Sequence, residues 1–195
     1  MNNSTPYKSL QRVATAFERL GIPYLIGGSL ASSAYGVFRM TNDVDMVIDI
    51  RLEQVKPLFE ALKDSFYIDE EMIQEAIESR SVANLIDLES FLKIDLFIAG
   101  EDEWSRTELK RRVMRTMKEG EDEYSVWFAS LEDTILYKLR RYRMGGEVSD
   151  RQWNDILGMM KSRPDAIDFE YLSRWTSEFG VGDLLFQAQA ESVFE

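Results

Sequence analysis

Cysteine and histidine are both missing from this chain of 195 residues. Without cysteine the protein has no disulfide, no thiolate nucleophile and no cysteine-zinc site. Without histidine it has no Ser-His-Asp triad, no imidazole base and no histidine-metal site. Any chemistry must therefore use carboxylates, lysine, arginine, hydroxyl groups and a bound metal ion.

Positive charge and long apolar segments are also scarce. Lysine and arginine total 23 against 35 acidic residues, a formal net charge of −12. This balance argues against broad non-specific binding to nucleic acid, although a local basic patch could still bind it. The first residues lack the charged and apolar blocks of a signal peptide. The longest weakly polar run, 24–38, is too short and too rich in glycine and serine to span a membrane. We therefore expect a cytoplasmic protein with no membrane partner.

One stretch, IGGSLASSAYGVFRMTNDVDMVID at 26–49, dominates the sequence. Its pattern indicates a strand end, a Gly-Gly-Ser turn, a short helix and a second strand that carries Asp43 and Asp45. Side chains alternate between the two faces of a strand, so these carboxylates share a face. The apolar residues between and after them point the other way, where a core is expected. Paired oxygen ligands suit Mg²⁺, which also takes substrate phosphates, so the strand predicts a metal site.

The Gly-Gly-Ser turn at 27–29 lies just upstream of the acidic strand. Glycine lets a backbone approach a ligand closely, and Ser29 opens a helix whose free N–H groups attract anions. Taken alone the turn is a weak signal, because a glycine pair after a strand is usually only a tight turn. Beside a metal-ligand pair it predicts a phosphate site.

A third acid, Asp95, stands in the apolar run KIDLFIAG. A carboxylate in such a setting is costly unless a positive group faces it. The alternative is that Asp95 lies on the polar side of a half-exposed strand. The turn, the Asp-x-Asp strand and this third acid, in this order, favour a metal-phosphate site.

Hydrophobic periodicity predicts a mixed α/β part followed by a helical part. Helices are expected at 7–20, 30–36, 52–65, 70–79, 103–110, 131–143, 149–161, 168–179 and 182–191. Strands are expected at 24–26, 44–50, 66–68, 82–88 and 92–98, with a hairpin of 111–117 and 124–128. We place the boundary near Ala129, which gives a core at 1–129 with a mixed sheet and a helical subdomain at 130–195.

The order of the three acidic and glycine motifs resembles that of the polymerase-beta-type nucleotidyltransferase superfamily. Closer matches are the abortive-infection AbiEii-type and MenT-type nucleotidyltransferases. The matching positions are Tyr35-Gly36, Arg39-x-Thr41-x-Asp43-Val44-Asp45 and the later Lys138. The resemblance covers roughly residues 22–160, and its core motif is the most specific part.

Two further motifs of these enzymes are matched only in part. The third, Asp-Leu-x-Ala-x-Lys, is matched at its ends by 133–138. The fourth, Arg-x-x-Lys-Asp-x-x-Asp, is matched by Arg151 and Asp155 but fails at Asn154 and Gly158, where lysine and aspartate are expected. The place of Asp155 in the site is therefore in question.

The resemblance implies an α+β fold, with an α/β mixed-sheet nucleotidyltransferase core followed by a C-terminal helical region. It implies an enzyme that uses Mg²⁺ or Mn²⁺ and moves an NMP from an NTP to a hydroxyl of a tRNA or protein acceptor. The setting would be toxin–antitoxin or phage defence, with an antitoxin or another protein as partner. The alternative is a catalytically silent nucleotide-binding or antitoxin-like module.

The resemblance also implies the residues of the site. Asp43, Asp45 and Asp95 would hold the metal. The catalytic set would be these three acids with Lys138. The nucleotide would be bound by Gly27, Gly28, Ser29, Arg39, Thr41 and Asp155.

Helix geometry separates two of these residues. Lys138 lies on the same stripe as Leu131 and Ile135, so it is expected to face inward. A buried lysine requires an anion nearby, and the triphosphate would supply one. The alternative is a lysine that snorkels at the helix flank. Asp155 falls away from the apolar stripe of its helix, and an exposed ion pair with Arg151 is enough to explain it.

Overall fold

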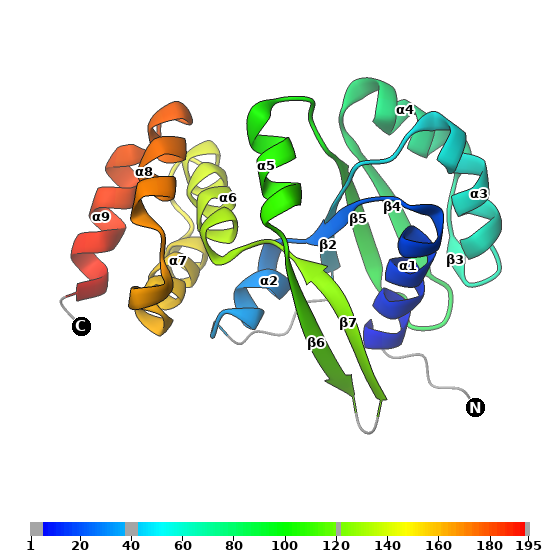
Figure 1. Cartoon of the computed structure of the whole chain (residues 1–195), viewed down its shortest axis with the longest axis horizontal. Helices are drawn as coiled ribbons and strands as arrows, with labels where there is room; N and C mark the ends of the chain where they lie inside the picture. Colours follow the sequence, from blue (N-terminus) through cyan, green and yellow to red (C-terminus); the bar gives the residue numbers. More distant parts are fainter. Residues whose placement is uncertain (1–5, 38–42, 120–121, 194–195) are drawn as a thin grey trace. The chain divides into compact units, whose positions relative to one another are not determined.

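A computed structural model of the chain describes residues 6–37, 43–119 and 122–193. These residues fall into two compact units (Figure 1). The first unit contains 6–27, 43–119 and 122–128, and the second contains 28–37 and 129–193. The C-terminal part of the second unit begins at Ala129, and this unit also takes in the short helix that follows the Gly-Gly-Ser turn.

A seven-stranded mixed sheet forms the centre of the first unit, in the order β3-β4-β5-β2-β1-β7-β6 (Figure 1). The β2–β5 and β1–β7 pairs are parallel, and the remaining neighbours are antiparallel. The strands are β1 (Tyr24–Ile26), β2 (Asp43–Ile48), β3 (Phe66–Tyr67), β4 (Val82–Asp87), β5 (Lys93–Ile98), β6 (Val113–Glu119) and β7 (Asp122–Phe128).

The helices of the first unit are α1 (Pro6–Leu20), α3 (Leu52–Leu62), α4 (Glu70–Ser79) and α5 (Glu103–Arg111). Two of them begin at an aspartate whose side chain accepts a hydrogen bond from a backbone N–H of the first turn: Asp69 from Met72, and Asp102 from Ser105. Such caps satisfy N–H groups that have no partner within the helix. The helices predicted for this part of the chain are present, with small shifts at their ends.

One face of the sheet is buried under α1. The strands β2, β4 and β5 share the same alternation of buried and accessible residues. Asp87 ends β4 on the buried face, where its Oδ1 accepts hydrogen bonds from the N–H groups of Glu89 and Ser90 at 2.9 and 2.7 Å. Burial opposes ionisation of Asp87, but these hydrogen bonds outweigh it and lower its pKa. Arg12 of α1 lies 3.7 Å from the same carboxylate, which places α1 on this face.

The second unit consists of helices, three of which begin at serine or aspartate caps. Ser130, Ser149 and Asp168 each accept a hydrogen bond from a backbone N–H of the first turn of the helix that follows. The helices are α2 (Gly28–Ala34), α6 (Leu131–Met144), α7 (Asp150–Ser162), α8 (Phe169–Glu178) and α9 (Gly182–Val193), with a 3-10 turn at Pro164–Ala166. Within the described ranges, no helix of either unit has the length and apolar character needed to cross a bilayer.

Close backbone packing joins the end of α2 to α7. The Ser162 hydroxyl donates to the Tyr35 carbonyl oxygen at 2.7 Å, and the Tyr35 hydroxyl donates to the Ala129 carbonyl oxygen at 2.7 Å. A Cβ atom on Gly158 would lie 2.9 Å from Cγ2 of Val37. There is no room for an aspartate at position 158, which explains why the fourth motif of the resembling enzymes fails there.

A buried ion pair connects α6 to α7. Nζ of Lys138 lies 2.7 Å from Oδ2 of Asp155, and the two side chains are 7% and 8% exposed. The inward orientation predicted for Lys138 is confirmed. The exposed pairing of Asp155 with Arg151 is wrong, because α6 packs against the flank of α7 that carries Asp155. The periodicity of a single helix cannot show which neighbour will cover its polar flank.

This pair yields a prediction about stability. Asp155→Leu alone, or Lys138→Met alone, should lower the free energy of unfolding by about 3–5 kcal/mol, because each leaves a buried charge without its partner. The double variant Lys138→Met/Asp155→Leu should recover most of that loss. Urea unfolding of all four proteins measures the coupling.

An exposed pair in the first unit provides the control. Lys118 lies 3.1 Å from Glu123, with side chains 70% and 55% exposed. Removing either partner should change the free energy of unfolding by less than about 1 kcal/mol. The double variant of Lys138 and Asp155 could instead lose as much free energy of unfolding as the two single variants together. That result would contradict the proposed coupling.

Candidate active site

The predicted metal ligands lie on the accessible face of the sheet, opposite α1. Asp43 and Asp45 follow the alternation of β2 and share one face, while Val44, Met46 and Ile48 are buried on the other. In the parallel pairing of β2 with β5, Asp45 stands directly opposite Asp95. Neighbouring strands are about 4.8 Å apart, so the carboxylates of these two residues are adjacent.

Lys93 adds a positive charge to this row, which the sequence interpretation missed. It lies two residues before Asp95 on β5 and directly opposite Asp43 on β2. Its Nζ atom is 2.8 Å from Oδ1 and 3.0 Å from Oδ2 of Asp95, and the hydrogen bond goes to Oδ2. The Asp95 side chain is only 15% exposed, so Lys93 is the positive group that its apolar setting requires. The two-residue spacing is a signal that could have identified Lys93.

Asn84 extends the polar row on the other side of Asp95. It is directly opposite Asp95 in the antiparallel pairing of β4 with β5, and it is half-buried. Its Oδ1 atom is buried and receives no hydrogen bond from the described residues. No sequence signal identifies this residue, because only the strand order places β4 beside β5.

The donor atoms of the row fit a hard divalent cation. Asp45 and Asp95 offer adjacent oxygen ligands of the kind that Mg²⁺ prefers. Oδ1 of Asp95 is buried and lies 2.8 Å from Nζ of Lys93, while the hydrogen bond of that ammonium goes to Oδ2, so a cation at Oδ1 would take the place of an ion-pair contact. Among the described residues, no group of three or more acidic side chains is gathered closely enough to hold a metal ion. The structure thus brings two of the three predicted ligands side by side, with Asp43 further along the same face.

The Gly-Gly-Ser turn is connected to the acidic strand through its first residue. The Gly27 N–H donates to the Asp45 carbonyl oxygen at 2.9 Å, so the end of β1 lies beside Asp45. Gly28 has φ +57°, a left-handed conformation that residues with a Cβ rarely adopt. Ser29 follows in the first turn of α2 and is half-buried. The glycine at position 28 is therefore required by the backbone itself.

The remaining predicted residues are not part of the acidic row. Arg39 and Thr41 lie outside the described residues. Lys138 and Asp155 both belong to the second unit, where they form the buried pair of α6 and α7. Their predicted contact with a nucleotide stays a prediction.

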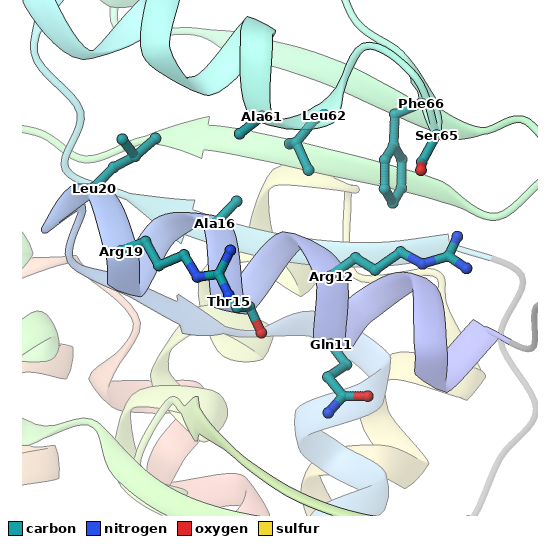
Figure 2. A pocket seen from close by; sticks show the side chains of 10 residues that line it. All are labelled: Gln11, Arg12, Thr15, Ala16, Arg19, Leu20, Ala61, Leu62, Ser65 and Phe66. Carbon is teal, nitrogen blue, oxygen red and sulfur yellow. The ribbon is translucent and has the colours of Figure 1, made fainter.

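A groove of about 410 Å³ runs between α1 and α3 on the face away from the acids (Figure 2). Figure 2 shows Ala16 of α1 and Leu62 of α3 pointing into it, with Arg12 and Arg19 along α1. Because Arg12 reaches Asp87 on the buried face of the sheet, this groove is separate from the row of Asp45 and Asp95.

Comparison with known proteins connects this architecture to a fold. No family model matches the chain, and no curated protein matches it. Solved structures do. An antigenic nucleotidyltransferase-like protein from Paracoccidioides brasiliensis is 17% identical with a TM-score of 0.50, over 82% of this chain and 76% of that one. ANT(2'')-Ia, solved with adenylyl-2''-tobramycin, is 15% identical with a TM-score of 0.52, over 90% and 97% of the two chains. The chain has the mixed α/β nucleotidyltransferase fold followed by a C-terminal helical region, as the sequence predicted.

Proposed function

We propose that this protein is a nucleotidyltransferase that uses Mg²⁺ or Mn²⁺ to move an NMP from an NTP to an acceptor hydroxyl. The observation that carries the proposal is the pairing of Asp45 with Asp95 on the accessible face of a sheet with this fold. Adjacent carboxylates repel each other, and a bound divalent cation turns that repulsion into attraction. A purely structural sheet has no use for such a row.

In the proposed reaction the chain's own residues position groups and move one proton. Asp43, Asp45 and Asp95 would hold the cation, and the carboxylate oxygen of Asp95 that does not face the cation would accept the proton of the acceptor hydroxyl. The hydroxyl oxygen then bonds to the α-phosphorus, the bond from that phosphorus to the bridging oxygen breaks, and pyrophosphate leaves. When bound, the cation would neutralise part of the negative charge on the phosphates.

The nucleotide contacts of the proposal are those that the sequence resemblance implies. Gly27, Gly28 and Ser29 bind phosphate through backbone N–H groups and the serine hydroxyl. Arg39 and Lys138 offset the negative charge of the phosphates, and Thr41 binds the nucleotide. Lys138 is already engaged by Asp155, so it must exchange that carboxylate for a phosphate when the nucleotide binds.

The acceptor and the biological setting rest on the sequence resemblance. A tRNA end or a protein hydroxyl is the proposed acceptor, and the net charge of −12 makes the RNA the harder of the two to attract. A toxin–antitoxin or phage-defence role, an antitoxin partner and a cytoplasmic location belong to the same proposal. Incubation with each labelled NTP, Mg²⁺, and either total tRNA or a cell lysate tests transfer and acceptor together. Nucleotide binding without transfer to any acceptor would favour a catalytically silent module.

The metal site gives the first functional prediction. Asp45→Asn should lower the rate of transfer by more than about a hundredfold, because even outer contacts to a metal ligand are worth roughly 10- to 100-fold. The melting temperature should stay the same or rise, since one repelling charge is removed. Asp49→Asn is the matched control, because Asp49 is exposed and lies beyond the end of β2. Near-normal transfer by Asp45→Asn would remove the basis of the metal assignment.

The Gly-Gly-Ser turn gives a second prediction, which needs no turnover. An NTP with Mg²⁺ should raise the melting temperature by mass action. Ser29→Ala should reduce this shift, whereas Ser33→Ala should not, because the Ser33 hydroxyl already donates to the Ser29 carbonyl oxygen at 3.1 Å. Differential scanning fluorimetry at several NTP concentrations measures both variants. Equal shifts for Ser29→Ala and the unchanged protein would mean that the nucleotide binds elsewhere.

A further inference from the structure

Lys93 is a positive charge placed inside the row of acids. It begins β5, its side chain is 49% exposed, and its Nζ atom contacts both carboxylate oxygens of Asp95. On the neighbouring strand the residue directly opposite Lys93 is Asp43. One ammonium group therefore contacts Asp95 and belongs to the residue that is paired with Asp43 in the register of the two strands.

This ammonium and a divalent cation compete for the same oxygen atoms. A carboxylate that is mostly buried requires a counter-charge, and Lys93 supplies it to Asp95. A divalent cation brings twice the charge of an ammonium and prefers oxygen ligands. When such a cation reaches Asp95, electrostatic repulsion drives Nζ away from it.

The displaced ammonium can contact a second anion. Lysine carries its charge on a flexible four-carbon stem with three donor hydrogens, and half of the Lys93 side chain already faces solvent. An NTP that follows the cation brings a triphosphate to the same row of residues. An ammonium leaving Asp95 meets that new anion within the reach of its own side chain.

We infer that Lys93 is an exchangeable counter-ion of the site: a divalent cation displaces it from Asp95, and it then contacts the phosphates of the bound nucleotide. The inference rests on the proposed function, because it assumes that the acids bind the cation and that an NTP follows. It assigns Lys93 a role in both states of the site. A lysine that only stabilised β5 would have no effect on the binding of either ligand.

Metal binding without nucleotide provides the first test. The dissociation constant for Mn²⁺, measured by calorimetry or by the paramagnetic resonance signal of free Mn²⁺, should fall about tenfold in Lys93→Met, the equivalent of one charge-assisted hydrogen bond. Lys118→Met is the control for a change of net charge, because Lys118 pairs with Glu123 on the β6–β7 hairpin. It should bind Mn²⁺ as the unchanged protein does.

Nucleotide binding provides the second test. At saturating Mg²⁺, Lys93→Met should bind a non-hydrolysable NTP analogue about tenfold more weakly, although it binds the metal more tightly. Lys93→Arg, which keeps the charge, should restore most of this affinity. The opposite signs of the two effects are the signature of an exchanging counter-ion, and a loss of fold would weaken both ligands together.

The outcomes separate this inference from the proposed function. If the unchanged protein binds no Mn²⁺, or if Asp45→Asn binds it equally well, the proposed metal site is wrong and the inference falls with it. If the metal binds at the acids but Lys93→Met leaves either the Mn²⁺ or the nucleotide affinity unchanged, the inference alone is overturned. Tighter metal binding together with weaker nucleotide binding supports both.

Discussion

The candidate site depends on the parallel pairing of β2 with β5. Its register sets Asp45 opposite Asp95, while Met46 and Leu96 pair on the buried face one position further along. A slip of one residue in β5 would turn its acid toward the core and its apolar residues toward solvent. The packing of the apolar face under α1 therefore keeps the two carboxylates together on the other face. Stability of the sheet and geometry of the site have the same physical origin.

Carboxylates held this close raise the free energy of the folded protein unless positive charge reaches them. Lys93 partly offsets the repulsion through its contacts with Asp95. The row also contains Asn84, a neutral residue whose buried oxygen receives no hydrogen bond from the described part of the chain. Unsatisfied polar atoms and concentrated charge are features that a structural sheet avoids and that ligand sites retain. They distinguish this face from the groove between α1 and α3, whose lining combines apolar side chains with Arg12 and Arg19 and contains no acid.

The packing of the second unit depends on two other features: a buried ion pair, and a glycine that allows close approach of two segments. Lys138 and Asp155 neutralise each other between α6 and α7, so neither charge is left uncompensated in an apolar setting. Gly158 lets the segment after α2 approach α7 to van der Waals distance. The two departures from the motif of the resembling enzymes thus differ in kind. Position 158 has a steric explanation, whereas nothing in the structure explains Asn154.

The local sequence determined most of the elements and which residues share a face. Alternation along β2 places Asp43 and Asp45 on one face whatever the strand pairs with, and the helix at Glu70–Ser79 appears where periodicity predicts it, with Asp69 as its cap. Only the tertiary structure decided the neighbours. The strand order brought Asp45 and Asn84 to Asp95, and the packing of α6 on α7 buried Asp155 instead of leaving it with Arg151. The physical reason is that alternation and capping act within a few residues, whereas register and helix packing depend on burying apolar surface contributed by distant parts of the chain.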